Sequence, residues 1–230
     1  MNNIVAIFKK QLKDTLKNKT VLVQFVMFPI ITLLMNNAIK MQDMPENFFV
    51  NLFSAMYIGM APLTSIASII SEEKEKNTLR VLIMSNVKPY EYLLGIGSYV
   101  WFACMLGGIV ICAAGGYNLQ TSIAFMGIIA VGILTSLLIG AIIGIWSKTQ
   151  MMATSIAVPV MMVFSFVPML SLFNSTIKKI ARIIYSEQIS RMLSQINSLQ
   201  LNWANIGIIV MNILIAAVMF IIIFRKCKLS

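Results

Sequence analysis

Histidine is absent from this 230-residue chain, and acidic side chains are scarce, with 8 Asp and Glu against 18 Lys and Arg. A chain without histidine lacks the commonest metal ligand and the side chain that most often acts as a general base. Ser–His–Asp and Cys–His catalytic sets are therefore excluded. We expect no catalytic residues, no metal site and no enzyme activity in this chain.

The three cysteines and the lysines form no binding motif either. Cys104 and Cys112 lie in one apolar run and Cys227 lies in the basic tail, so neither a disulfide framework nor a metal-ligand spacing is indicated. The stretch "GIWSKT" (144–149) lacks the spacing of a GxxxxGK[ST] phosphate-binding loop. We therefore expect no cofactor to be bound by this chain.

Charged residues make up only 11% of the sequence, whereas hydrophobic residues make up 59%. An ordinary soluble domain has about 25% charged residues. Several apolar runs are about 20 residues long, enough to cross a hydrocarbon core of about 30 Å as helices. The sequence therefore predicts an all-α polytopic membrane protein. Its net charge of +10 indicates basic loops on the cytoplasmic side of a membrane, and we expect no nucleic-acid partner.

Six transmembrane helices are expected, within a single domain of residues 1–230. The predicted spans are 20–39, 48–70, 92–114, 122–146, 151–173 and 204–224. With a cytoplasmic N-terminus, most Lys and Arg fall on the cytoplasmic side, and the exceptions are Lys40, Lys178, Lys179, Arg182 and Arg191. This bias predicts that both termini are cytoplasmic.

Ionisable Asp, Glu, Lys and Arg are missing from the predicted spans. Proton-coupled transporters generally need such groups within the membrane to relay protons. If the chain is a pump, its energy is therefore expected to come from another chain.

Residues 1–19 have the pattern of an amphipathic helix. Phe8 and Leu12 belong to an apolar stripe, whereas Lys9 and Lys13 lie beside or opposite it. This pattern favours a helix that lies in the membrane interface with its lysines near anionic headgroups. The simpler interpretation, a basic flank of the first span, stays open.

The segment 174–203 is too long for a plain turn, and its two halves have apolar faces that point in different directions. We predict an extracellular re-entrant segment of two short helices in the outer leaflet. The expected break is near residues 185–187, where Ser186 would cap the second helix and Glu187 would lie in its first turn. A single kinked surface helix is the alternative.

Small residues recur at four-residue spacing in two predicted spans. Ser136, Gly140 and Gly144 do so in one span, and Ala103 and Gly107 in another. Such spacing allows close approach of a neighbouring helix. It does not tell whether that neighbour belongs to the same chain.

Residues 71–91 form a charged, helix-prone patch that the charge bias places in the cytoplasm. Ser71 can cap a helix, Glu72 and Glu73 favour its first turn, and Glu72 and Lys76 have the spacing of an ion pair. The patch is consistent with a short amphipathic helix at the membrane surface. A solvated loop is equally compatible with its residues.

The stretch "EEKEKNTLRVLIMSNVKPYEYLLG" (72–95) is similar to the signature of ABC-2 type transporter permeases. That signature has two acidic residues, a Gly-Thr pair, a Leu-rich stretch, a turn with proline, and an aromatic–acidic pair. The matching residues are Glu72, Glu73, Thr78, Leu82, Val87 and Glu91. Asn77 replaces the usual glycine, a substitution that left-handed backbone geometry tolerates, and Asn86 replaces a proline. The six-span layout also resembles the family.

The resemblance implies the transmembrane subunit of a bacterial ABC exporter. A separate cytoplasmic ABC ATPase would bind ATP and Mg, and a second permease subunit would form a homodimer or heterodimer. The ATPase-docking residues implied in the coupling segment are Glu72, Glu73, Lys76, Thr78, Arg80 and Leu82, with Phe8, Lys9, Leu12 and Lys13 on the interfacial helix. The substrate path is expected to include Asn51, Thr64 and Phe164.

The expected cargo is amphipathic or hydrophobic. Small permeases of this layout resemble exporters of antimicrobial or cytolytic peptides in Gram-positive bacteria, including phenol-soluble modulin exporters. Drugs, lipids and glycans stay open as substrates. An ATP-independent channel or an immunity-type membrane protein is the alternative function. In each case we expect a multi-pass protein of the cytoplasmic membrane of a Gram-positive bacterium.

Overall fold

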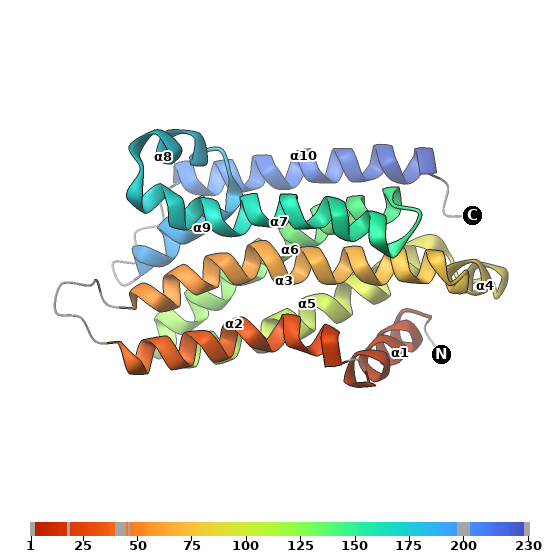
Figure 1. Ribbon diagram of the computed structural model, residues 1–230, viewed down its shortest axis with the longest axis horizontal. Helices are drawn as coiled ribbons and strands as arrows, with labels where there is room; N and C mark the ends of the chain where they lie inside the picture. Colours follow the sequence, from red (N-terminus) through yellow and green to blue (C-terminus); the bar gives the residue numbers. More distant parts are fainter. Residues whose placement is uncertain (1–2, 18, 40–44, 46, 197–202, 228–230) are drawn as a thin grey trace.

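The computed structural model describes residues 3–17, 19–39, 45, 47–196 and 203–227 (Figure 1). These residues form α-helices and no strand, so the predicted all-α class is confirmed. The helices are α1 (Asn3–Lys17), α2 (Lys19–Ala38), α3 (Phe48–Glu75), α4 (Thr78–Met84), α5 (Pro89–Ala114), α6 (Leu119–Trp146), α7 (Gln150–Phe173), α8 (Ser175–Ala181), α9 (Tyr185–Ser194) and α10 (Trp203–Cys227).

The long helices run side by side along the length of the molecule (Figure 1). Within the described residues, α3, α5, α6, α7 and α10 are each long and apolar enough to cross a membrane. A sixth span is counted if α2 is taken together with α1, and the axes of Asn3–Lys17 and Leu22–Ala38 differ by 70°. The structure therefore agrees with a multi-pass membrane protein of five or six spans.

Helix α3 lies at the centre of the bundle and is the most buried of the long helices. It packs against α2, α5, α6, α7 and α9. Its contact with α6 is close because the hydroxyl of Ser136 donates to the carbonyl of Ile58, with 2.6 Å between the oxygens, and because Gly140 lies against Leu63. The small residues of α6 therefore pack against a helix of the same chain.

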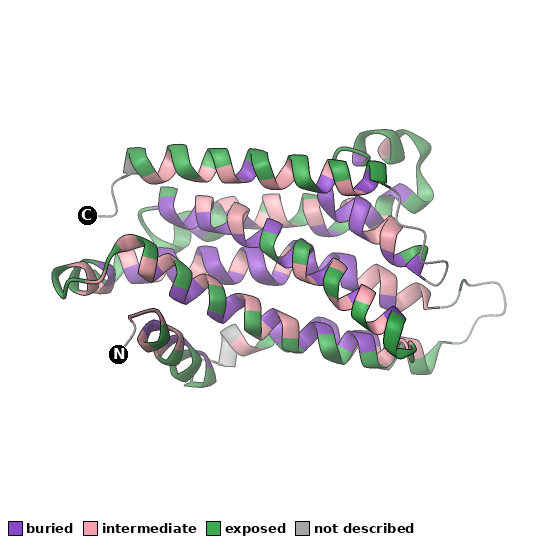
Figure 2. Ribbon diagram, turned by 180° about the vertical axis from the view of Figure 1, so that it is seen from behind, coloured by how far each residue is buried: buried purple, intermediate pink, exposed green. Residues whose placement is uncertain are grey.

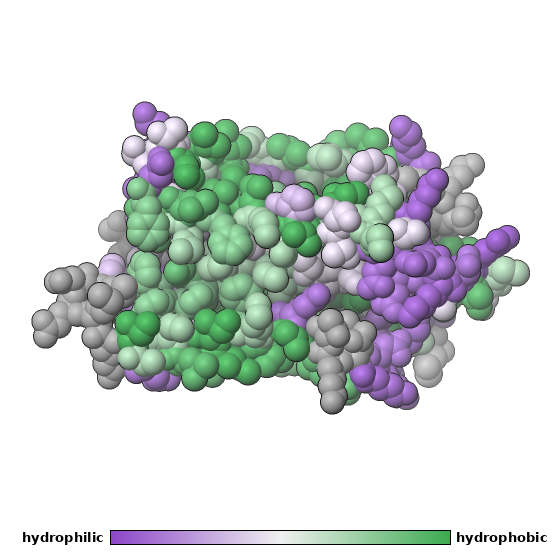
Figure 3. All heavy atoms as spheres, viewed as in Figure 1, coloured by the Kyte–Doolittle hydropathy of each residue, from purple (hydrophilic) through white to green (hydrophobic). Residues whose placement is uncertain are grey.

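The surface of the bundle is divided into an apolar middle and polar ends. Hydrophobic side chains cover the middle of the face shown in Figure 3, and hydrophilic ones gather at the end where α4 lies. The outer helices α7 and α10 expose much of their apolar surface (Figure 2). Such a belt is what a membrane-embedded bundle presents to lipid.

Two predicted helix starts are wrong. Ser71 lies inside α3, which continues through the charged residues to Glu75 before the chain turns. Ser186 also lies inside a helix, because the break in the segment comes at residues 182–184 and Ile184 is the N-cap of α9. Glu187 does lie in the first turn of α9. The rest of the predicted 174–203 segment, residues 197–202, lies outside the described residues.

Candidate functional site: the charged end of α3

The last residues of α3 each contact a different helix. The carboxylate of Glu73 accepts hydrogen bonds from Lys10 Nζ at 2.5 Å and Gln11 Nε2 at 2.6 Å, both on α1. Lys74 Nζ donates to the carbonyl oxygens of Ile145, at 2.5 Å, and of Ser147, at 2.6 Å. These two carbonyls lie at the end of α6, where helix carbonyls lack intrahelical partners.

Glu75 joins α3 to a third helix, α7. Its Oε2 accepts from the backbone N–H of Gln150, the first residue of α7, with 2.6 Å between the two atoms. Because a helix has about 3.6 residues per turn, three successive side chains point in three different directions. The end of α3 therefore ties together α1, the end of α6 and the start of α7.

Glu73 is the most buried charge at this junction, with 9% of its side chain exposed. Its Oε2 and the hydroxyl of Tyr92 on α5 have no hydrogen-bond partner of good geometry among the described residues, although the two groups interact electrostatically. The backbone carbonyl of Glu73 also accepts a hydrogen bond from Thr78 Oγ1, at 3.0 Å, at the start of α4. Glu73 thus connects α3 to three other helices.

Asparagines shape the turns on both sides of α4. Asn77 has φ 56°, the left-handed conformation, and lies in the turn between α3 and α4. Asn86, at φ 65°, follows the end of α4. There the N–H of Asn86 bonds to the carbonyl of Ile83 and the N–H of Val87 to that of Leu82, a Schellman motif. Asparagine is well suited to both positions because it tolerates positive φ better than most residues.

Helix α4 has a packed face and an open face. Leu79 is buried, and Leu82 is half-buried against the core. Arg80, Val81 and Met84 are exposed, Met84 to 79%. The open face therefore offers a short apolar surface beside a positive charge.

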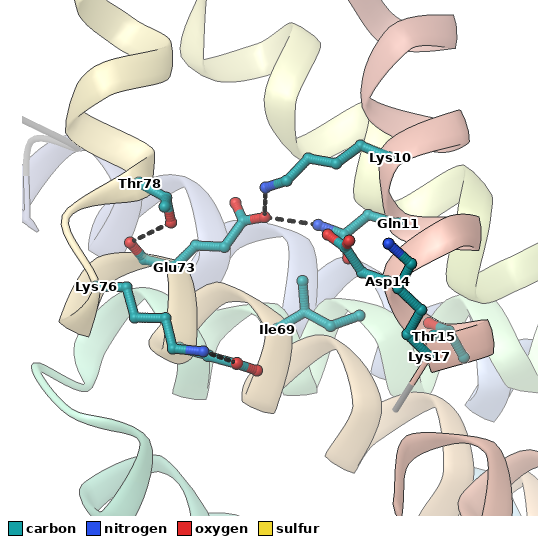
Figure 4. A pocket seen from close by; sticks show the side chains of 10 residues that line it. Lys10, Gln11, Asp14, Thr15, Lys17, Ile69, Glu73, Lys76 and Thr78 are labelled. Atoms are coloured by element: carbon teal, nitrogen blue, oxygen red, sulfur yellow. Dashed lines mark hydrogen bonds and ion pairs between the residues drawn. The ribbon is translucent and has the colours of Figure 1, made fainter. Parts of the chain in front are cut away.

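A cavity of about 340 Å³ lies between α1 and the end of α3 (Figure 4). Its walls carry both signs of charge, with Lys10, Asp14 and Lys17 from α1 facing Glu72 and Glu73 from α3. Lys76 lies at its edge, and the hydrogen bond from its Nζ to Glu72, reinforced by the charge of Glu72, raises the pKa of Lys76. Lys76 is thus paired with Glu72 in the lining of the cavity.

Comparison of the chain with protein families gives a match. The family model described as "ABC-2 family transporter protein" matches residues 2–225. The chain belongs to the ABC-2 transporter family. A search of curated proteins found no match. Members of the ABC-2 family are membrane components of transporters, are generally not catalytic themselves, and work with an ATPase partner.

The residues predicted for ATPase docking in the coupling segment lie at different depths. Lys76 and Arg80 are exposed, and Glu72 is partly exposed at the cavity. Glu73 is buried against α1, and the Thr78 hydroxyl is bonded within the chain. The stretch therefore combines a surface with an internal junction.

The predicted residues of α1 are also divided between interior and surface. The ring of Phe8 packs edge-on against Tyr99 and Phe102 of α5, with ring centroids 5.8 Å apart in both pairs. Lys9 and Lys13 are exposed, and Leu12 lines an apolar groove.

Several residues of this site were not among those predicted from the sequence. Lys10 and Gln11 contact Glu73, and Lys74 and Glu75 hold the ends of α6 and α7. Val81 and Met84 provide the apolar part of the open face of α4. Val81 and Met84 were visible as apolar residues in the sequence, but which face of α4 would be packed was not.

The three residues expected in the substrate path lie in different surroundings. Thr64 lines a hollow of about 150 Å³ between α2, α3 and α7, and Gln24 of α2 belongs to the same lining. Asn51 accepts a hydrogen bond from the Tyr117 hydroxyl at 3.3 Å. The ring of Phe164 packs on Tyr185, with 4.9 Å between centroids.

Proposed function

We propose that this chain is the permease subunit of an ATP-driven exporter, powered by a separate ABC ATPase on the cytoplasmic side. The observation that carries the proposal is the set of contacts at the end of α3, where one rigid helix is tied to α1, α4, α6 and α7. A force applied to such a junction is transmitted to most of the bundle. An ABC-2 protein that works with an ATPase needs an element with this property.

In this proposal the ATPase binds the open face of α4. Arg80, Val81 and Met84 are exposed there, and Lys76 stands beside them. A compact apolar contact flanked by charge is typical of protein interfaces, in which a few buried anchors supply most of the binding energy. Glu72 and the lysines of α1 extend the surface toward the cavity. Glu73, Thr78 and Leu82 transmit movement inward instead of touching the partner.

The substitution Met84→Glu is expected to weaken ATPase docking at least tenfold. The substitution places a negative charge in the apolar centre of the proposed contact. Burial of an unpaired carboxylate there is costly. Because Met84 is 79% exposed, the fold is expected to stay intact. The measurement is co-purification of the full permease with a co-expressed ABC ATPase, together with stimulation of ATP hydrolysis.

Leu119→Glu is the matched control. Leu119 is 80% exposed and lies at the start of α6, at the opposite end of the bundle from α4. An acidic residue in the first turn of a helix is favourable, so this variant is expected to fold and to dock normally. Normal docking by Met84→Glu would contradict the proposed surface. A chain that transports with no ATPase would instead support an ATP-independent channel or an immunity-type protein.

We further propose that a second permease subunit, identical or different, completes the substrate path. The hollow beside Thr64 opens between three membrane helices and is lined by both polar and apolar residues, including Gln24, Met60 and Met161. Flexible methionines adapt to varied apolar surfaces. This lining supports amphipathic or hydrophobic cargo, with antimicrobial or cytolytic peptides as the best candidates; drugs, lipids and glycans are the alternative substrates.

The proposed topology has α4 and both termini in the cytoplasm and α8 outside, in the cytoplasmic membrane of a Gram-positive bacterium. It predicts opposite labelling of two serine-to-cysteine variants, Ser85→Cys after α4 and Ser175→Cys in α8, since both serines are exposed. With Cys227 replaced by serine, the remaining Cys104 and Cys112 are buried. An impermeant maleimide should label position 175 in intact cells and position 85 in inverted vesicles. The reverse pattern would overturn the topology.

A further inference from the structure

An apolar groove of about 410 Å³ runs along the outside of the bundle between α1, α2 and α5. Its lining includes Leu12, Leu16, Phe25, Val26, Phe102 and Leu106. On α5 the lining extends from Tyr99 to Val110, which corresponds to about 16 Å of helix. The groove is therefore elongated and apolar.

Small residues line this groove on α5. Ala103 and Gly107 lie one turn apart, and both belong to the lining. A Cβ atom at Gly107 would overlap the hydroxyl of the buried Tyr57 and approach the carbonyl oxygen of Phe25, so the glycine allows α5 to pack closely on α2 and α3. Pro29, opposite on α2, contributes a ring instead of a long side chain. The hollow thus follows from the residues present on both helices.

Lysines border the groove where it meets α1. Leu12 and Leu16 form that end of the lining. Lys9 and Lys13 precede them by three residues each, and side chains at this spacing are neighbours on one face of a helix. Both lysines are exposed. Two positive charges therefore stand next to the apolar channel, at the end of the bundle that carries α1.

We propose that this groove binds one acyl chain of an anionic diacyl phospholipid, with the phosphate of that lipid held by Lys9 and Lys13. The groove matches the chain in shape and polarity, and the lysines match the charge of the headgroup. Positively charged residues on an amphipathic helix attract anionic lipids in the same way.

A second copy of the permease fits the groove less well. In a two-fold dimer both subunits contribute the same surface, so the interface would contain the lysines of α1 twice, and the described groove lining supplies no acidic side chain to pair with them. Like charges placed together at an interface are unfavourable. Charge complementarity therefore favours an anionic lipid as the occupant.

The test uses the full permease, purified in detergent and freed of lipid, titrated with phosphatidylglycerol or phosphatidylcholine and read by native mass spectrometry. The wild-type protein is expected to bind phosphatidylglycerol more tightly. The Lys9→Gln/Lys13→Gln variant should lose about tenfold in affinity for phosphatidylglycerol and little for phosphatidylcholine. Ala103→Phe fills the groove and should weaken binding of both lipids.

Two controls accompany these variants. Lys178→Gln/Lys179→Gln removes an exposed pair of lysines on α8, away from the groove, and Val131→Phe adds a ring at an exposed site on α6. Both should bind lipid as the wild type does. Equal binding of the two lipids by the wild type, or undiminished binding by Ala103→Phe, would overturn the proposal. Loss of dimers in Ala103→Phe, with unchanged lipid binding, would identify a second copy as the occupant.

Discussion

Replacing Gly140 with alanine is expected to destabilise the bundle by about 3 kcal/mol, the upper part of the usual range for overpacking a core. A Cβ atom at this position would overlap the carbonyl oxygen of Leu63 and lie 2.6 Å from Cγ2 of Ile66. The oxygen belongs to the backbone of α3, so it cannot move away by a change of side-chain rotamer. The two helices would have to separate.

Separation of α3 and α6 is opposed from the other side of α3. Gly59 lies against the backbone of α7 so closely that a Cβ atom there would come within 2.7 Å of the carbonyl carbon of Phe164. Helix α3 is therefore held between α6 and α7 by backbone contacts on two faces. The strain of an added methyl group at position 140 cannot be relieved by a small shift of α3 alone.

Gly127→Ala on the same helix is the matched control. No described atom other than its own helix neighbours lies within 4 Å of a Cβ atom at position 127. Alanine there should leave stability unchanged or raise it slightly, because alanine favours helix over glycine. The measurement is the thermal unfolding midpoint of each purified variant in the same detergent. Equal midpoints for the two variants would contradict the close contact between α3 and α6.

The sequence predicted that the small residues of α6 form a packing face, but it did not predict which helix packs against that face. A spacing of four residues places Ser136, Gly140 and Gly144 on one face, and this face packs as expected. The spacing carries no information about which helix approaches it. That helix is α3, because Ser136 bonds to Ile58 and Gly140 meets Leu63. Contacts between distant segments of the chain are set by the whole bundle, and local periodicity does not report them.

The charged stretch at the end of α3 was predicted in part for a similar reason. The ion pair between Glu72 and Lys76 is local, and the structure contains it. The contacts of Glu73 with Lys10 and Gln11 join residues that are more than 60 positions apart. Helix α3 also extends into the charged residues because they are satisfied by α1, α6 and α7. The sequence does not show these distant partners, so it predicted a span that ends at residue 70.

Replacing Glu73 with alanine is the second change with a large expected effect, a loss of about 3 kcal/mol or more in the free energy of unfolding. Removing one partner of a buried charged pair leaves the other partner uncompensated. Lys10 is partly exposed and can turn toward water, but Gln11 is buried and would lose the acceptor of its amide. An unsatisfied buried amide is costly by itself.

Glu72→Ala is a close control for Glu73→Ala. Glu72 is the adjacent residue and is also paired with a lysine at 2.5 Å, but its side chain is 30% exposed and that of Lys76 is 64% exposed. Surface ion pairs of this kind contribute little. The unfolding midpoint should therefore fall for Glu73→Ala and stay near the wild-type value for Glu72→Ala. Equal effects would show that burial against α1 does not set the importance of Glu73.

Glu73→Gln then separates stability from coupling. Glutamine keeps a carbonyl oxygen that can accept from Gln11, so this variant is expected to fold, but it lacks the charge that holds Lys10. The open face of α4 is untouched, so the ATPase should still bind. If the pair transmits movement between α3 and α1, ATP-driven transport in proteoliposomes should fall at least tenfold while docking is retained. Normal transport by Glu73→Gln would assign the pair a purely structural role and would not bear on the proposed docking surface on α4.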